Sequence, residues 1–394
     1  MTRERFILHM NVADFAVAAE RIQDAGLAEK PLIISPLQAA RAVVYDMSEE
    51  AYGDGVRKGM ALREAARLCR RAQILPPRFE LYHKVMHAFV REAQMFSPLL
   101  ESGNGDGHLF LDITGTHRLI GAPPDVGWRL RKQAQQKIGI DPIWSVAANK
   151  LVAKVASRLV KPAGEYFVSP GEEASFLAPL SVRLLPGIDS QEMARLNEFN
   201  ITQVGQLATL DHAQLFSVFG KRGETLHNIS HGVDQERIRP YCRHRDRVVR
   251  EHHVLADDTA EKRVIEGIVT ALAVRIGMKL RTDQLVGRRL ALQLNYSDGS
   301  LVVRQASVKH GVSDEDTLRT LALLALERAW NRRTRVRSCI LTCSRLHAAS
   351  RQLTLFAATD KKQQRQQRLM AAMDLVRKQF GVDSLRFASQ AWLQ

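Results

Sequence analysis

The stretch SVAANKLVAKVASRLVKP, from Ser145 to Pro162, decides the fold of the N-terminal half of the chain. It begins inside a short apolar run that predicts a buried strand near Ile143–Ala147. Apolar residues then recur at helical spacing, which predicts a helix over Asn149–Val160. This strand and helix complete about 165 residues in which strands and helices alternate. Such alternation predicts an α/β or α+β domain with one main sheet.

The residues before this stretch supply the other elements of that domain. Gly53, Gly55 and Gly59 predict a loop between two of them. We expect strands at Arg5–Val12, Pro31–Ser35, Arg41–Asp46 and His108–Thr114, and helices at Ala13–Ile22, Ala61–Arg71, Leu81–Phe96 and Val126–Ile138.

The residues after it change character twice. Residues 176–233 have a helical pattern throughout, and an arginine-dense connector follows at residues 237–250. A compact α+β pattern comes next, and a polar tail from His347 ends in a helix expected at Gln364–Phe380. The elements of the α+β part are a strand Val248–Leu255, a helix Ala260–Arg281, a hairpin of Arg288–Asn295 and Leu301–His310, a helix Asp316–Trp330 and a strand Arg337–Cys343.

The charge of the chain predicts an anionic partner. The 394 residues include 57 Lys and Arg against 42 Asp and Glu, a formal net charge of +15. Residues 236–345 alone hold 22 basic against 13 acidic residues. Nucleic acid is the usual partner of such a protein, and an anionic membrane surface is the second candidate.

Several function classes are disfavoured by composition. No apolar run is long enough to span a bilayer, and the N-terminus is a poor signal peptide. The four cysteines form no CxxC pair and no zinc pattern, so we expect reduced, structural thiols in a cytoplasmic protein.

Five strings, in this order, resemble the Y-family of DNA polymerases, the lesion-bypass enzymes. The resemblance is closest to the DinB group and its catalytically inactive ImuB-type members, and it covers nearly the whole chain. The strings are GVRKGMALREAARLC (Gly55–Cys69, fingers), LFLDITGTHRLIG (Leu109–Gly121, the strand after the catalytic Ser-x-Asp-Glu), the opening stretch (palm), LPGI (Leu185–Ile188, thumb) and FGKRGETLHNISHGVD (Phe219–Asp234, thumb).

The resemblance implies an α+β multidomain fold shaped like a right hand. It would comprise a palm with a ferredoxin-like sheet, small fingers, a helical helix–hairpin–helix thumb and an α+β little finger, followed by a C-terminal tail. The expected bounds are residues 1–165 for palm and fingers (fingers about 24–76), 166–235 for the thumb, 236–246 for a basic linker, 247–346 for the little finger and 347–394 for the tail.

The metal-binding positions of the family are altered in this sequence. Nucleotidyl transfer needs two Mg²⁺ ions held by hard carboxylate oxygens, which the family supplies from one Asp and an Asp-Glu pair. Alignment puts Asn11, Gly107 and His108 at these positions. With all three carboxylates lost, the resemblance implies a pseudo-polymerase with no catalytic residue, no metal and no cofactor.

The nucleotide-binding positions point the same way. The family's triphosphate-binding Tyr and Arg align with Glu49 and Tyr52, and its steric-gate aromatic aligns with Ala16. Only Lys161 remains, as a vestige of the triphosphate site.

A displaced metal site is the competing hypothesis. Asp14, Asp106 and Asp112 lie near the altered motifs and would hold Mg²⁺ in an active translesion polymerase. We favour helix capping or a structural hydrogen bond as the role of Asp14 and Asp112.

Basic residues mark three candidate DNA-binding surfaces. Turns of the Pro-Gly-Ile type present backbone N–H groups to a phosphate, and Leu185–Ile188 is such a turn, although Asp189 stands where the family commonly has Gly. The candidate DNA-binding residues are Lys221 and Arg222 in the thumb, Arg243, Arg245 and Arg247 in the linker, and Arg304 and Lys309 on the hairpin.

The tail contains a pentapeptide that matches the bacterial sliding-clamp-binding motif Gln-Leu-x-Leu-Phe. Its matching residues are Gln352, Leu353, Leu355 and Phe356. An exposed tail gains nothing from three large apolar residues unless a partner buries them. The alternative is packing on the little finger, and the terminal helix likewise either docks on another protein or packs on the body.

These observations predict a non-catalytic adaptor in damage-induced translesion synthesis and SOS mutagenesis. The expected partners are DNA, the sliding clamp (the beta subunit of the replicative polymerase), an active translesion or replicative polymerase and an accessory mutagenesis protein, with no membrane. The rivals are the active translesion polymerase and a plain DNA-binding accessory factor.

Overall fold

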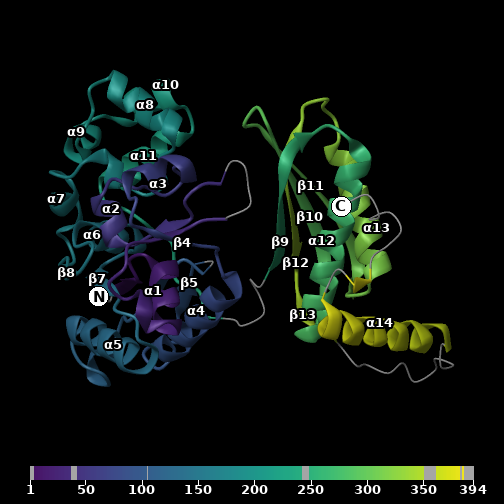
Figure 1. Ribbon diagram of the computed structural model, residues 1–394. Coiled ribbons are helices and arrows are strands. Elements are labelled where there is room, and N and C mark those ends of the chain that lie inside the picture. The colour runs from purple at the N-terminus through teal and green to yellow at the C-terminus, as the bar shows by residue number, and fades with distance from the viewer. Residues whose placement is uncertain are drawn as a thin grey trace. The chain divides into compact units, whose positions relative to one another are not determined.

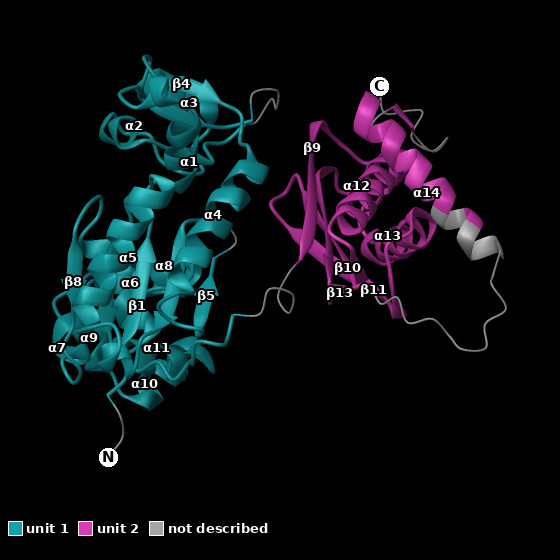
Figure 2. Cartoon of the chain, turned by 90° about the horizontal axis from the view of Figure 1, so that it is seen from below, with its two compact units in different colours: residues 1–37, 41–241 teal, residues 38–40, 242–394 magenta. Residues whose placement is uncertain are grey.

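The computed structural model describes residues 4–36, 42–103, 105–241, 248–349, 361–381 and 384–385. They form two compact units, one of residues 1–37 and 41–241 and one of residues 38–40 and 242–394 (Figure 2). Arg243, Arg245, Arg247 and the pentapeptide Gln352–Phe356 lie outside the described residues.

A five-stranded sheet with the order β5-β6-β1-β7-β8 forms the palm of the first unit (Figure 1). The central strand β1 (Ile7–Asn11) is antiparallel to both of its neighbours, β6 (His108–Asp112) and β7 (Ile143–Ala147). The edge strands are β5 (Leu100–Ser102) and β8 (Glu165–Phe167). One main sheet was the expectation, and the predicted strand at 143–147 is confirmed to the residue.

Helices cover both faces of the palm sheet. Leu8 and Met10 of β1 share one core with three helices, whereas Ile7 belongs to a second core on the other face. Because side chains alternate along a strand, His9 and Asn11 lie on the face of Ile7. The helices are α1 (Phe15–Gln23), α4 (Phe79–Ala93) and α5 (Pro123–Ile138) on the first face and α6 (Lys150–Leu159) on the second, with short 3-10 turns η1 (Ala25–Leu27) and η2 (Thr116–Arg118).

A small sheet with the order β3-β2-β4 forms the fingers. The expected loop around Gly53, Gly55 and Gly59 is present at residues 54–60, and a short helix that we did not expect precedes it, beginning at Glu49. Ser48 caps this helix by accepting a hydrogen bond from the backbone N–H of Ala51 at 3.5 Å. The elements are β2 (Leu32–Ile34), β3 (Asp46–Met47), α2 (Glu49–Gly53), α3 (Leu62–Leu68) and β4 (Gln73–Leu75).

The thumb region is helical throughout its described length, as predicted. Its helices are short, and two of them begin at aspartate side-chain caps, Asp189 and Asp211; the Asp211 carboxylate accepts from the N–H of Gln214 at 2.7 Å. The elements are α7 (Glu173–Leu177), the 3-10 turn η3 (Val182–Leu184), α8 (Ser190–Glu198), α9 (Val204–Ala208), α10 (His212–Phe219) and α11 (Arg222–Ser230).

The second unit contains a five-stranded antiparallel sheet, in which four strands have the order β11-β10-β12-β9 and β13 also pairs with β10, and two helices pack on one face (Figure 1). β10 and β11 form the predicted hairpin, in which Asn295 pairs with Leu301. Cys339 and Cys343 point into the core, where burial raises the pKa of each thiol to about 12. The elements are β9 (Val249–Thr259), α12 (Lys262–Thr282), β10 (Leu285–Tyr296), β11 (Leu301–Val312), α13 (Glu315–Ala329), β12 (Val336–Ser344) and β13 (His347–Ala348).

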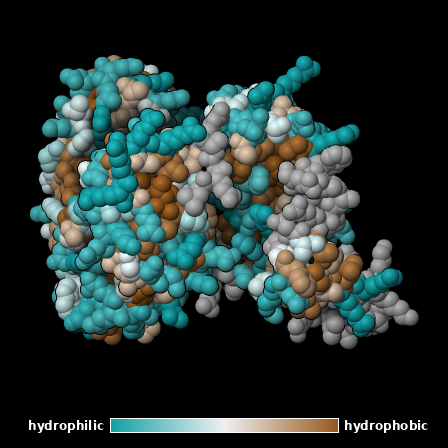
Figure 3. Space-filling model, in the orientation of Figure 1, coloured by the Kyte–Doolittle hydropathy of each residue, from teal (hydrophilic) through white to brown (hydrophobic). Residues whose placement is uncertain are grey.

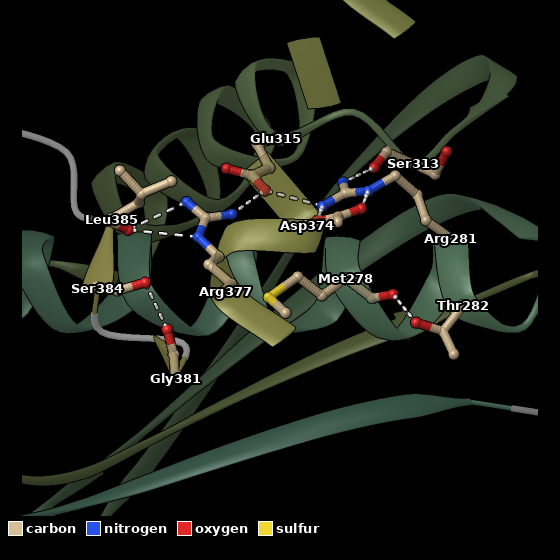
Figure 4. A network of polar contacts seen from close by, with 10 residues as sticks. All are labelled: Met278, Arg281, Thr282, Ser313, Glu315, Asp374, Arg377, Gly381, Ser384 and Leu385. Atoms are coloured by element: carbon tan, nitrogen blue, oxygen red, sulfur yellow. Dashed lines mark hydrogen bonds and ion pairs between the residues drawn. The ribbon is translucent and has the colours of Figure 1, made fainter. Parts of the chain in front are cut away.

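The terminal helix α14 (Lys361–Phe380) packs on this unit through a network of buried charges (Figure 4). Glu315 is fully buried at the start of α13, and its carboxylate accepts hydrogen bonds from Arg281 of α12 at 2.8 Å and from the buried Arg377 of α14. Arg281 also forms a paired contact with Asp374 of α14 at 2.6 and 2.7 Å. Of the two expectations for this helix, packing on the body is the one that these contacts support.

Exposed apolar side chains follow another side of α14. Leu369, Leu375 and Phe380 are each more than half exposed. Figure 3 shows an apolar area on the second unit where Figure 1 has α14. The helix therefore has a charged inner face and a partly apolar outer face.

Removing one cation from the network should destabilise the second unit. Arg377→Ala leaves a buried carboxylate with a single cation, and breaking a buried pair in this way costs about 3–5 kcal/mol. We expect faster hydrogen exchange of the amides in α13 and α14. Lys378→Ala, at the exposed next position, is the matched control, and equal exchange in the two variants would contradict a stabilising network.

Candidate functional site

The pairing of β1 with β6 brings together the three residues that the resemblance places at the metal positions. Asn11 and His108 are Cα partners in the register of the two strands. Gly107 directly precedes His108, and its carbonyl accepts a hydrogen bond from the N–H of Val12 at 3.0 Å. The alignment of Asn11, Gly107 and His108 with one metal site is therefore consistent with their positions in the fold.

A hydrogen-bonded chain of side chains runs from His108 into the interior. His9 Nδ1 lies 2.8 Å from the hydroxyl of Ser157, and His9 Nε2 lies 3.1 Å from His108 Nδ1. The Ser157 hydroxyl donates to the carbonyl of Lys154 at 2.9 Å, so it accepts from His9 Nδ1–H. His9 Nε2 then accepts from His108 Nδ1–H. This arrangement requires a neutral His9, because its Nε2 acts as an acceptor and has no proton.

Electrostatics also keep the two histidines neutral. Burial lowers the pKa of His9 well below its usual value, and the neighbouring His108 and cations lower it further. Burial lowers the pKa of His108 to about 4, against the opposing effect of Asp106. The cations that act on both rings are Lys154, Arg158 and Lys161. The site thus has no anionic group at the three aligned positions and is surrounded by positive charge.

The residues at these positions do not fit a pair of Mg²⁺ ions. Asn11 is 1% exposed, and its amide nitrogen has no hydrogen-bond partner among the described residues. An imidazole nitrogen suits softer metals. At Gly107, φ is +79° and an added Cβ would lie 2.9 Å from the Phe15 side chain and 3.0 Å from the Val12 carbonyl oxygen. The backbone here rejects any side chain, a carboxylate included.

The nearby carboxylates do not replace the lost ones. Asp112 accepts a hydrogen bond from the N–H of Thr114 at 3.0 Å, the structural role that we expected. Asp106 accepts from the N–H of His108 at 3.3 Å. The expected helix-capping role of Asp14 is wrong, because it makes no cap hydrogen bond. Within the described ranges, no group of three or more His, Cys, Asp or Glu residues is arranged to hold a metal ion.

Asp14 instead has an environment that favours its protonated form. Its backbone is left-handed, with a φ of 48°, just before α1. Burial and the nearby Asp46 raise the pKa of its carboxyl to about 6. Asp46 itself pairs with Lys58 at 2.8 Å.

The residues expected at the nucleotide positions lie in the fingers and just after α6. Glu49 is exposed in the first turn of α2. The guanidinium of Arg57 lies 3.8 Å from the centre of the Tyr52 ring. Lys161 follows α6, and burial together with Lys58 lowers its pKa.

The thumb residues proposed for DNA are partly engaged within the protein. Arg222 donates to the carboxylate of Glu192 at 2.7 and 3.1 Å and to the carbonyl of Gly187 at 2.7 Å. Asp189 fills the N-terminus of α8 by accepting from the N–H of Glu192 at 2.7 Å. The Asp189 carboxylate therefore occupies the helix N-terminus after the Leu185–Ile188 turn, where a DNA phosphate was expected. This contact weakens the prediction that the turn binds DNA.

The other described candidates for DNA binding are open to solvent. Lys221 is exposed at the start of α11, and Arg304 and Lys309 are exposed on β11. A cleft of about 840 Å³ lies between palm and thumb, with Lys150 and Lys154 in its wall. Lys150 is neutralised by Glu101 and Glu236, at 2.7 and 2.8 Å.

Sequence reasoning missed His9, which belongs to no motif. The only signal was its alternation with Ile7 and Asn11, which places it on the same face of β1.

No helix among the described residues is long and apolar enough to cross a membrane.

Known protein families match most of the chain. The impB/mucB/samB family matches residues 10–158, and its C-terminal domain matches residues 247–355. The thumb domain of DNA polymerase-iota matches residues 183–234. The DNA polymerase IV of Halorhodospira halophila is 30% identical over 356 residues, which cover 90% of this chain and 99% of that protein. The chain belongs to the Y-family, in its DinB/UmuC superfamily.

Other members are similar over the same length. The DNA polymerase IV of Dehalococcoides mccartyi strain CBDB1 is 27% identical over 383 residues, which cover 97% of this Y-family chain and 96% of that protein.

Solved Y-family structures have the same fold. A Y-family DNA polymerase chimera of Dbh and Dpo4 has a TM-score of 0.73 at 20% identity, over 87% of this chain and 99% of that one. DinB from Sulfolobus solfataricus has a TM-score of 0.62 at 20% identity, over 86% and 98%. The expected α+β fold, with a helix–hairpin–helix thumb and a C-terminal little finger, is confirmed.

The neutral histidines should make the stability of the palm depend on pH. The pKa of His108 is about 4 in the folded chain and about 6.5 in an unfolded one, so the unfolded chain binds more protons between these values. Stability therefore falls as the pH drops from 7 to 5. We expect this loss to be about 1–2 kcal/mol smaller in His108→Asn, which keeps a donor but does not titrate.

The raised pKa of Asp14 has the opposite effect on stability, because the folded chain binds a proton at Asp14 at pH values where the unfolded chain does not. This effect is the same in wild type and in the His108→Asn variant. Urea unfolding at the two pH values, followed through hydrogen exchange of β1 amides, measures the difference. Parallel pH profiles for wild type and variant would contradict a neutral His108.

Proposed function

We propose that this Y-family protein is a non-catalytic adaptor that binds DNA and the sliding clamp in damage-induced translesion synthesis. The observation that carries the proposal is that Asn11, Gly107 and His108 stand where the family resemblance implies metal-binding carboxylates. Asn11 is buried, Gly107 has no room for a side chain, and His108 is neutral. The palm keeps its fold, but these three positions offer no carboxylate ligand to a dication.

Binding of DNA is the function that the remaining features support. The chain has a net charge of +15, and its described basic residues include exposed ones on β11. Contacts from Lys and Arg to phosphates give affinity without sequence readout and weaken with salt. One of the similar solved structures is an insertion ternary complex of Dbh DNA polymerase. In the adaptor proposal, the template and primer are held without being extended, and an active polymerase partner performs synthesis.

An active translesion polymerase is the second candidate, because the curated relatives above are named DNA polymerase IV. That candidate needs carboxylates that converge on one point. Asp106 and Asp112 instead bond to backbone N–H groups, and Asp14 has a raised pKa.

A primer-extension assay tests the adaptor proposal. Purified protein should add no dNTP to a primed template in the presence of Mg²⁺ or Mn²⁺, because no ligand set holds either ion. An active Y-family polymerase serves as the positive control. Extension that disappears on Asp14→Ala or Asp112→Ala would overturn the adaptor in favour of a displaced metal site.

Clamp binding rests on the pentapeptide Gln352–Phe356. Leu355 and Phe356 are its expected anchors, and such anchors hold most of the energy of a small interface. Burial of each contributes about 1.5–3 kcal/mol before ordering costs.

Replacing both anchors by Ala should abolish association with the clamp of the same organism while the melting temperature stays near that of wild type. Thr354→Ala, at the variable position of the same peptide, is the matched control and should bind normally. Calorimetric titration and thermal melting on the same samples separate the alternatives. If the peptide packs on the little finger instead, the double variant melts earlier and the wild type shows no clamp binding.

A further inference from the structure

Two large apolar side chains are exposed on the outer side of helix α5 in the palm. Leu119 is 90% exposed and Trp128 is 52% exposed. Leu119 follows the turn η2, and Trp128 lies in the second turn of α5. Neither residue takes part in the candidate site described above, so their exposure needs another reason.

Contacts within the palm place these two side chains on one surface. Arg129 donates a hydrogen bond to the carbonyl of Ile120 at 2.6 Å, so the segment after Leu119 lies against α5. Trp128 and Lys132 are one helical turn apart, and the Lys132 ammonium lies 4.8 Å from the centre of the Trp128 ring. We call this surface the α5 patch; it is formed by Arg118, Leu119, Trp128, Arg129 and Lys132.

The support beneath the α5 patch is rigid. Val126 and Leu130, on the inner side of α5, are fully buried in the palm core. Gly127 lets the helix approach the Trp144 ring of β7 so closely that a Cβ on Gly127 would lie 2.5 Å from it. Ile120 packs against the same core, which fixes the backbone that carries Leu119. A preformed surface of this kind loses little conformational entropy when a ligand binds.

The α5 patch carries an excess of positive charge. Its three cations, Arg118, Arg129 and Lys132, are all exposed. Asp125 is an exposed carboxylate on the same side of α5, and it accepts a hydrogen bond from the N–H of Ala122 at 3.2 Å. Three cations around one engaged carboxylate complement a ligand that combines negative charges with an apolar side chain.

The size and composition of the α5 patch favour a short peptide as the occupant. Two apolar side chains cover far less than the roughly 800 Å² that each partner contributes to a standard protein interface. Trp and Arg are the residues that most often anchor protein contacts. Single-stranded nucleic acid stacks on flat rings, and the protruding aliphatic chain of Leu119 offers no such ring.

The α5 patch lies on the opposite side of the palm sheet from the aligned metal positions. The inner side of α5 shares its core with Leu8 and Met10 of β1, whereas Asn11 lies on the face covered by α6. In Figure 1, α5 lies at the lower edge of the first unit. A ligand on the patch therefore leaves the surroundings of Asn11 and His108 open.

We propose that the α5 patch is a docking site for an acidic linear segment of a partner protein. An aromatic or leucine side chain of the segment packs against Leu119 and Trp128, and its carboxylates pair with the surrounding cations. This docking site goes beyond the proposed function and requires neither DNA nor the clamp. Removal of an anchor such as Trp128 from a small interface lowers affinity about tenfold or more.

A random peptide library displayed on phage is the probe, because it offers acidic, neutral and basic segments together. The library is first depleted on the Trp128→Ala protein and then selected on the wild-type protein. Synthetic peptides with the selected sequences are titrated by fluorescence anisotropy against Trp128→Ala, Leu119→Ser and Lys132→Glu, with Trp128→Phe to retain a ring. Phe216→Ala is the matched control, because Phe216 is an exposed aromatic residue on α10 of the thumb. Circular dichroism melting confirms that each variant is folded.

We expect the selected peptides to be rich in Asp and Glu and to contain Leu or an aromatic residue. Their affinity should fall about tenfold for Trp128→Ala, Leu119→Ser and Lys132→Glu, and should stay near that of wild type for Phe216→Ala and Trp128→Phe.

Three results would overturn the docking site. They are a library that yields no peptide specific for the wild-type protein, selected peptides without an acidic excess, and equal affinity for wild type and Trp128→Ala. Oligothymidylate is titrated in parallel. If its affinity falls in Trp128→Ala but not in Phe216→Ala, the patch binds nucleic acid and the protein partner is wrong.

Discussion

The pairing of β1 with two antiparallel neighbours is the constraint on which the first unit depends. Every residue of β1 is buried, so each side chain must fit one of two packed layers. Leu8 and Met10 pack into the core of α1, α4 and α5, and Ile7, His9 and Asn11 face α6. The same register sets Asn11 opposite His108. The arrangement of Asn11 opposite His108 is thus a consequence of the sheet and does not need a metal.

Carboxylates at the positions of Asn11, Gly107 and His108 would place other demands on their surroundings. Three carboxylates in one place repel each other unless dications balance them. Neutral residues remove that requirement, but buried polar atoms then need hydrogen-bond partners. The chain from His108 through His9 to Ser157 satisfies most of them, while the Asn11 amide nitrogen has no partner among the described residues. Lys154, Arg158 and Lys161 lower the pKa values of His9 and His108 and so help to keep both imidazoles neutral.

The sequence predicted the elements with strong periodicity and missed features that arise from tertiary contacts. The strand at 143–147 and the helices of the little finger follow from local pattern. The role of His9 depends on Ser157, which lies 148 residues away, and no local pattern contains it. The left-handed backbone of Gly107 follows from its packing against Phe15. The sequence left the packing of α14 open, because its buried residues include the charged Arg377 beside the apolar Met370, whereas Leu369 and Leu375 are exposed.

The position of α14 also restricts how the proposed clamp peptide is presented. Ala349 donates its N–H to the carbonyl of Gln284, and α14, which begins at Lys361, is joined to the same unit through Arg377. The peptide therefore lies between two anchored ends instead of in a free tail. The eleven residues between Ala349 and Lys361 span at most about 40 Å when fully extended. A clamp that binds Gln352–Phe356 must accordingly come close to the second unit. Such short tethering raises the effective concentration of any second contact between them.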